Sequence, residues 1–206
     1  MINYKKGETM GDYLALVNKE NKFNPQMVEG FKFNEIVDNY GDTGFVEQQA
    51  FEAFCALKQR VSELGVKMTI NSAGRTIEDQ KKAFLDLEKE YGTEYAKSHT
   101  AMPGFSEHHT GLAIDVKLEK DNPNVFERFK AKIHNNKNKL YEILDSELTN
   151  FGFIKRYTAD KSEITGFPPE RWHIRFVGRS NALAIAKEGL CLEEYVEKIK
   201  AKEKAS

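Results

Sequence analysis

The stretch SEHHTGLAIDV, Ser106 to Val116, places an aspartate inside an apolar run. The segment LAIDV predicts a strand, in which alternate side chains share one face. Leu112 and Ile114 then point to one side, while Ala113 and Asp115 point to the other, together with Gly111. We expect the two small residues to leave open space beside the carboxylate, as a ligand or substrate would need.

A carboxylate buried in such a strand needs a cationic partner, because an unpaired buried charge is costly. A metal ion is one such partner, and His108, in the preceding loop, can supply a second ligand. The alternative is an aspartate that caps the strand end or forms a salt bridge. The segment alone favours neither reading, since His and Asp occur together commonly by chance.

A second segment, PPERWHIRF at residues 168–176, favours the metal. A catalytic zinc ion takes three protein ligands and keeps one open position. His108, Asp115 and His173 supply two imidazoles and a carboxylate, and Glu170 remains as a candidate general base. A half-buried strand histidine and a solvated loop glutamate are the alternatives, and together they leave the first motif unexplained.

A third segment, NSAGRTIEDQ at residues 71–80, places Arg75 in a turn between a strand and a helix. An arginine fixed in a turn can stabilise an oxyanion or hold a substrate carboxylate. An exposed surface arginine is the ordinary alternative.

Composition limits the class of protein. The chain has 206 residues, a net charge of -1 and 40% hydrophobic residues, which suits one globular domain and argues against a dedicated nucleic-acid binder. It contains no apolar run of about 18 residues, so we expect no membrane span. Without a signal-peptide pattern we expect a cytoplasmic protein, unless the sequence has been trimmed.

Cys55 and Cys191 lie in apolar helical patterns and are expected to be buried free thiols.

The pattern of elements predicts a single α+β domain over residues 1–206, with a central, mainly antiparallel sheet flanked by helices. We expect a loop or insertion at residues 119–137. The remaining expected elements are strands at residues 13–17, 66–70, 112–116, 153–157 and 172–177, and helices at residues 46–64, 76–91, 139–151 and 180–202, the last with a break at Gly189.

The two motifs resemble the S-x-H-x-x-G-x-A-x-D and E-x-W-H signatures of the LAS zinc metallopeptidases. The chain is most similar to their D-alanyl-D-alanine carboxypeptidase and dipeptidase branch, of the VanY/VanXY type, with the related peptidoglycan L,D-carboxypeptidases. The likeness runs from LVNKEN, through GRTIEDQ and FGFIKRY, to GLCLEEY, and so covers nearly the whole chain. It implies the LAS, hedgehog-like fold and a peptidoglycan stem peptide or D-Ala-D-Ala dipeptide as substrate.

Residue by residue, the resemblance implies Zn²⁺ on His108, Asp115 and His173, with Glu170 as catalytic base. It implies that Arg75 polarises the scissile carbonyl or its oxyanion. Substrate-binding positions are matched by Ser106, Gln80 and Tyr157.

His109 falls at a position that varies in the family and is often Gln, so we expect it not to be a ligand. His99 and His134 match nothing and are interpreted as surface or packing residues.

The chain also departs from the family pattern. Ala73-Gly74-Arg75 replaces the usual Gly-Tyr-Arg, which removes an aromatic wall beside the arginine, and Arg171 replaces the usual Pro after Glu170. The alternatives to terminal D-Ala removal are an L,D-carboxypeptidase that trims tetrapeptide stems, a phage-lysin endopeptidase, and a non-catalytic peptidoglycan-binding module. Glu170 argues against the last, because a module that only binds needs no base.

Overall fold

The structure, a computed structural model, describes residues 12–120 and 137–205. Within these residues the strands form a two-stranded hairpin and a four-stranded sheet of order β3-β4-β6-β5, in which every neighbouring pair is antiparallel. This confirms the α+β class. The strands are β1 (Phe33–Val37), β2 (Thr43–Glu47), β3 (Val66–Ser72), β4 (Ala113–Lys120), β5 (Phe153–Tyr157) and β6 (Glu170–Phe176).

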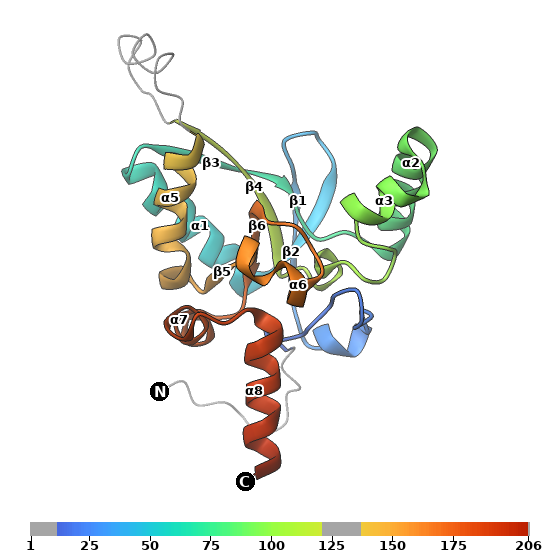
Figure 1. Cartoon of the computed structure of the whole chain (residues 1–206). Helices are drawn as coiled ribbons and strands as arrows, with labels where there is room; N and C mark the ends of the chain where they lie inside the picture. The colour runs from blue at the N-terminus through green and yellow to red at the C-terminus, as the bar shows by residue number, and fades with distance from the viewer. Residues whose placement is uncertain (1–11, 121–136, 206) are drawn as a thin grey trace, which may run out of the picture.

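Helices lie on either side of the four-stranded sheet in Figure 1. In this view α1 and α5 lie together at the left, and α2 and α3 lie together at the right. The last helix, α8, leads away from the body of the molecule. The helices are α1 (Gln48–Glu63), α2 (Ile77–Tyr91), α3 (Thr93–His99), α5 (Lys137–Glu147), α6 (Ser162–Thr165), α7 (Arg179–Glu188) and α8 (Leu192–Ala205), with short 3-10 turns η1 (Pro25–Val28), η2 (Glu107–Thr110), η3 (Leu148–Phe151) and η4 (Ala159–Lys161).

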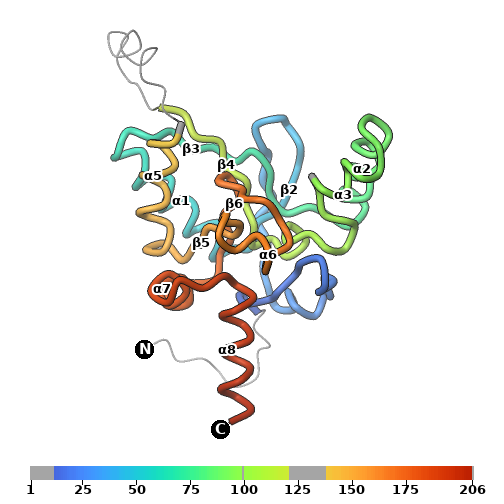
Figure 2. The backbone as a smooth tube through the Cα atoms, in the orientation of Figure 1, coloured from blue at the N-terminus to red at the C-terminus, as the bar shows by residue number. Residues whose placement is uncertain are grey.

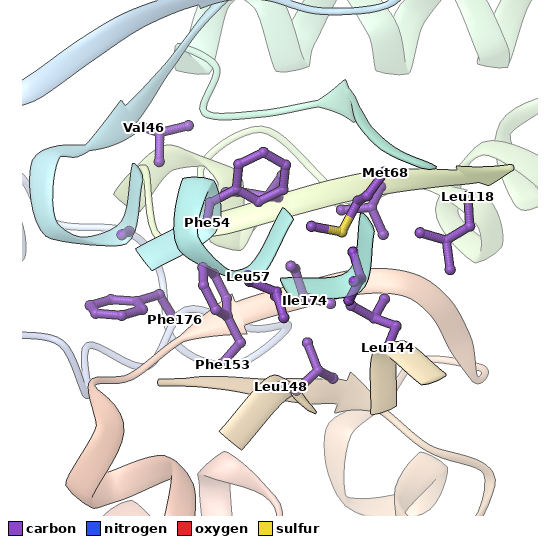
Figure 3. Close-up of a cluster of buried hydrophobic side chains, with 14 of the residues drawn as sticks. Val46, Phe54, Leu57, Met68, Leu118, Leu144, Leu148, Phe153, Ile174 and Phe176 are labelled. Atoms are coloured by element: carbon purple, nitrogen blue, oxygen red, sulfur yellow. The ribbon is translucent and has the colours of Figure 1, made fainter. Parts of the chain in front are cut away.

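The main core lies between one face of the sheet and helices α1 and α5 (Figure 3). Helix α1 presents a helically spaced apolar stripe that includes Phe54 and Leu57. From the sheet, Met68, Ile114 and Ile174 enter the same cluster. Successive side chains of a strand point to opposite faces of the sheet. Asp115, next to Ile114 in β4, and His173, next to Ile174 in β6, therefore point to the face away from this core.

The segment at residues 13–17 is not a strand, contrary to the sequence prediction. The guanidinium of Arg175 donates to the backbone carbonyls of Tyr13 and Ala15, at 3.1 and 2.8 Å, so these carbonyls bond to a side chain and not to a neighbouring strand. Leu14 and Leu16 pack on a second apolar cluster that contains Leu192 of α8. The segment accordingly lies close to the beginning of α8 in Figure 2.

Three further expectations need correction. Residue 46 belongs to β2, so the first helix begins later than predicted, and the β1–β2 hairpin was not predicted. Cys55 is exposed because it lies beside the buried stripe of α1, whereas Cys191 is buried as expected. Residues 119 and 120 continue β4 and residue 137 begins α5, while 121–136 lie outside the described residues.

In the part of the chain that the structure describes, none of the helices has the length and apolar character needed to cross a membrane.

Candidate metal centre and active site

Two strands and one 3-10 turn bring the predicted ligands together. Asp115 on β4 and His173 on β6 lie directly opposite each other in the antiparallel register. His108 lies in η2, which is capped at its start by Ser106 and is followed by Gly111 in the left-handed conformation. One ligand atom from each of the three residues lies within 4.8 Å of the others. The sheet register therefore accounts for two ligands, and the capped turn before β4 supplies the third.

The atoms that face the centre are the ones a metal ion would use. Nε2 of His108 lies 3.4 Å from Oδ2 of Asp115, and Nδ1 of His173 lies 3.1 Å from Oδ1. Ligands of a tetrahedral zinc ion lie roughly 3.4 Å apart, given bonds of about 2.1 Å. Oδ1 of Asp115 is buried and has no hydrogen bond within the described residues. A buried carboxylate with one imidazole nitrogen close to each of its oxygens, and with no hydrogen bond to Oδ1, fits a cation between the three side chains.

Each histidine is oriented through its other ring nitrogen. Nδ1 of His108 donates to the carbonyl of Ala73 at 2.7 Å, which leaves Nε2 free to act as a ligand. Nε2 of His173 lies 3.3 Å from Oε2 of Glu107, which turns Nδ1 toward Asp115. Metal-binding histidines characteristically make such outer contacts, because these contacts fix the tautomer and the ring orientation.

The three side chains shift one another's pKa values, and the carboxylate of Asp115 stays ionised between the two histidines. Burial alone would raise the pKa of Asp115, but His108 and His173 hold this pKa well below its usual range. Burial and the nearby Arg75 guanidinium lower the pKa of His108. Burial also acts to lower the pKa of His173, yet Asp115 and Glu107 raise it to about 9.

Glu107 is a site residue that the sequence analysis missed. Its side chain is fully buried, and its Oε1 accepts from Nε of Arg156 at 2.6 Å and from Nη1 of Arg175 at 2.9 Å. Burial would raise its pKa, but the two arginines hold it well below its usual range. The usable signal was a pair of arginines in apolar strands, Arg156 and Arg175, because buried guanidinium groups require a carboxylate.

A cleft of about 250 Å³ opens beside the three ligands. A larger cavity, of about 740 Å³, lies near the starts of α1 and α7 and contains none of the predicted site residues. We therefore assign the site by its chemistry and not by cavity size. The smaller cleft is lined by Arg75, Thr100, Ala101, Phe105, Ser106, Glu107, His108, Asp115, Tyr157, Phe167, Glu170, Trp172 and His173.

Glu170 begins β6 at the edge of this cleft, with Oε2 at 3.8 Å from Nδ1 of His173. Burial and the neighbouring Asp115 raise the pKa of Glu170, although His173 and Arg75 act against this rise. A carboxylate whose pKa is raised toward neutrality is a better proton acceptor than an ordinary one. Its position and environment thus suit a general base.

Arg75 faces the same centre from the turn after β3. Burial lowers its pKa, while Asp115 and Glu170 favour its charged form. Its Nε is buried and has no hydrogen-bond partner in the described part of the chain. The guanidinium therefore retains donor capacity for a substrate oxygen.

The three predicted substrate-binding residues lie in different places. Ser106 and Tyr157 line the cleft, and the Tyr157 ring lies 4.9 Å from that of His173 between centroids. Gln80 is fully buried and does not line it. Its amide donates to Thr100 and Ala101, at 3.0 and 2.6 Å, so it supports the cleft wall from behind.

The expectation for Gly111 is wrong, and Arg171 has contacts of its own. Gly111 leaves no space for a ligand: a Cβ atom there would lie 2.7 Å from the Phe33 ring, and its φ of +68° favours glycine. Arg171 is held over α5, where it donates to Oδ1 of Asn138 at 3.0 Å and covers the Tyr141 ring at 4.9 Å. His134 lies outside the described residues, as does the side chain of His99.

Residues 43–179 match the family model of VanY, D-alanyl-D-alanine carboxypeptidase, and the chain therefore belongs to this family of metallopeptidases. It is 38% identical over 141 residues to a D-alanyl-D-alanine carboxypeptidase of Enterococcus faecalis, an alignment that covers 64% of this chain and 48% of the relative. The chain thus spans about half the length of that curated relative.

Solved structures show the same fold. VanYB in complex with D-alanine-D-alanine superposes with a TM-score of 0.72 at 31% identity, covering 90% of this chain and 97% of the other. A variant of the vancomycin-resistance D,D-pentapeptidase VanY, in complex with Zn(II), gives a TM-score of 0.71 at 32% identity, covering 89% and 98%.

Proposed function

We propose that this chain, acting as one domain over residues 1–206, is a zinc-dependent carboxypeptidase or dipeptidase. Its substrates would be peptidoglycan precursors or stem peptides that end in D-Ala-D-Ala, from which it removes the terminal D-Ala. The observation that carries the proposal is the convergence of His108, Asp115 and His173 in one cleft beside Glu170. The similarity to a VanY solved with Zn(II) and to VanYB solved with D-alanine-D-alanine supports the metal and the substrate.

The three ligands fit zinc because two imidazoles and one carboxylate are its usual donors and leave an open coordination position. Zinc bound there supplies Lewis acidity, which polarises a carbonyl and favours deprotonation of water near neutral pH. Glu170 accepts the proton of the attacking water and later delivers it to the leaving amine. Arg75 donates hydrogen bonds to the oxygen that becomes negative as the carbonyl is attacked.

Ser106 and Tyr157 remain to hold the terminal D-residue, since both line the cleft. Burial raises the pKa of Tyr157 well above its usual value, so its hydroxyl keeps its proton and can donate to a carboxylate. Gln80 would support the substrate through Thr100 and Ala101, to which its amide donates.

Metal analysis tests the centre. We expect about one zinc per chain in the purified protein, lost on changing His108, Asp115 or His173 to Ala. His109→Ala is the matched control, because its imidazole is adjacent in sequence and lies outside the triad. Full zinc occupancy in His173→Ala would remove that residue from the site. Loss of zinc from His109→Ala, but not from His108→Ala, would show that the wrong neighbour was assigned.

Product analysis tests the reaction class. The zinc-loaded protein would be incubated with D-Ala-D-Ala, a pentapeptide stem and a tetrapeptide stem. Release of D-Ala from the first two supports the proposal. Release from the tetrapeptide alone indicates an L,D-carboxypeptidase, an internal cut indicates an endopeptidase, and binding without cleavage indicates a peptidoglycan-binding module.

A further inference from the structure

His109 is a buried imidazole that the metal triad leaves out, and both of its ring nitrogens are bonded to backbone groups. Nδ1 lies 2.9 Å from the carbonyl oxygen of Arg75, and Nε2 accepts from the N–H of Gly104 at 3.1 Å. Because a carbonyl can only accept, Nδ1 carries the hydrogen and Nε2 is the acceptor. A single side chain therefore joins two loops that are far apart in the sequence.

Both of these loops line the cleft. Arg75 lines it from the turn after β3, while Ala101, Phe105 and Ser106 line it from the segment that contains Gly104. The Gly104 carbonyl also accepts from the N–H of Phe23 at 2.8 Å, so the loop is held on its outer side as well. The position of Arg75 relative to residues 100–106 thus depends on the His109 bridge.

The Arg75 backbone is held by two consecutive residues of η2. Its N–H donates to the carbonyl of His108 at 3.2 Å, and its carbonyl accepts from His109. The guanidinium Nε has no hydrogen-bond partner among the described residues. The position of the Arg75 side chain therefore depends on where its backbone is fixed, more than on bonds made along the side chain.

We propose that His109 is a positioning residue that sets Arg75 against the 100–106 wall, so that the guanidinium reaches the carbonyl under attack. This inference rests on the proposed hydrolytic function. A displacement of about 1 Å in a group that orients a reaction can cost on the order of a hundredfold in rate. Loss of the bridge also leaves the Arg75 carbonyl and the Gly104 N–H without their partner.

The first experiment is steady-state kinetics of three zinc-loaded variants on a D-Ala-D-Ala-ended pentapeptide. His109→Ala and His109→Leu should lower kcat by roughly 10- to 100-fold, with a smaller change in KM. His109→Gln should restore most of the rate, because its amide again offers one donor and one acceptor. Equal rates in the Gln and Leu variants, or a normal kcat in both Ala and Leu, would overturn the inference.

A double-mutant cycle separates positioning from general packing. If His109 acts through Arg75, His109→Ala should cost less than about twofold in an Arg75→Ala background, since coupled residues are non-additive. A full additional loss would contradict the assignment.

A second readout does not need turnover. Amide hydrogen exchange of residues 73–76 and 100–106 should be faster in His109→Ala and should return toward wild type in His109→Gln. Unchanged exchange in His109→Ala would overturn the bridge even if the wild type hydrolyses its substrate. If the wild type fails to release D-Ala but the two variants show the expected exchange rates, the proposed function is overturned and the bridge is still supported.

Discussion

At the scale of single residues, Arg75 has two possible roles that differ in their kinetics. A contact with the developing oxyanion acts mainly in the transition state, so its loss lowers kcat and kcat/KM together, whereas loss of a ground-state carboxylate clamp chiefly raises KM. We expect the first pattern for Arg75→Ala, because Ser106 and Tyr157 remain in the cleft to hold the carboxylate.

Arg75→Lys should rescue poorly, since lysine keeps the charge and loses the planar fork. The measurement is steady-state kinetics on a D-Ala-ended peptide, with Arg179→Lys, an exposed arginine outside the cleft, as control. A large rise in KM at unchanged kcat would make Arg75 a binding residue.

Glu107 gives a prediction about the metal. It contacts Nε2 of His173, the ring nitrogen that faces away from the centre. Loss of such an outer partner typically lowers metal affinity 10- to 100-fold. We expect that decrease for Glu107→Gln in a chelator competition, and no decrease for the exposed control Glu142→Gln. Equal zinc affinity in both variants would show that Glu107 serves the fold alone.

Local sequence motifs were enough to predict the three metal ligands. They were not enough to predict Glu107, which contacts one of these ligands from outside the centre. His108, Asp115 and His173 lie in short segments with typical metal-ligand chemistry, and the structure brings them together. Glu107 was overlooked because its partners, Arg156 and Arg175, come from strands about 50 to 70 residues away. Such a partnership depends on the strand register, which the motifs do not encode.

At the scale of elements, the β1–β2 hairpin fills space left by a small residue. Gly74 forms a bridge with Phe45 of β2, and a Cβ atom at residue 74 would lie 2.6 Å from the Phe45 ring. The aromatic group missing from the Ala73-Gly74-Arg75 turn therefore has a counterpart in the hairpin. The φ of Gly74 is not positive, so the hairpin, and not backbone strain, excludes a side chain there.

This packing predicts that Gly74→Ala is harmful. Overpacking typically costs about 1–3 kcal/mol of stability, and a displaced turn would also move Arg75 and lower kcat. Urea unfolding and kinetics would measure the two effects, with Lys58→Ala on the exposed face of α1 as control. Wild-type stability and kcat in Gly74→Ala would refute the close contact.

Elements with regular periodicity were predicted well, and those fixed by tertiary contacts were not. Helix α2 and strands β3 and β5 match their sequence patterns. The apolar run at residues 13–17 has the composition of a strand, but two of its backbone carbonyls accept hydrogen bonds from the Arg175 guanidinium. The hairpin had a usable turn signal in residues 38–42, DNYGD, between two short runs that alternate only weakly.

At the scale of the whole molecule, a buried ionic network joins the N-terminal segment, the sheet and α8. Arg156 binds Glu193 of α8 through two hydrogen bonds, at 2.9 and 2.5 Å, and also binds Glu107 beside the metal centre. Asn18 donates to the same Glu193 at 3.1 Å. The network thus connects Asn18 and Glu193 to His173 through Arg156 and Glu107.

Glu193 gives this network a pH dependence. Burial would raise its pKa, but Arg156 and Asn18 lower it below the usual value. Because folding lowers this pKa, the stabilisation is complete above the unfolded value of about 4.3 and is lost as the pH falls through the lower folded value. Glu193→Gln should therefore lose about 3 kcal/mol at pH 7 and show a weaker decline in acid.

Urea unfolding between pH 7 and pH 3 would check this prediction. Glu197→Gln, an exposed glutamate on the same helix, is the control. Parallel stability curves for wild type and Glu193→Gln throughout that range would show that Glu193 does not contribute to the acid-sensitive stability.

The proposed hydrolysis with Glu170 as base is tested most directly by D-Ala release from a D-Ala-D-Ala-ended pentapeptide. The zinc-loaded proteins compared are the wild type, Glu170→Gln and Glu163→Gln. Glu163 is exposed and outside the cleft, so its variant controls for the loss of a carboxylate. A positioned general base contributes about 10²–10⁴ in rate. We predict release by the wild type and the control, and a loss of about a hundredfold or more in Glu170→Gln with zinc retained. Near-normal release by Glu170→Gln would contradict the role of Glu170 as base, and no release by the wild type would contradict the proposed hydrolysis.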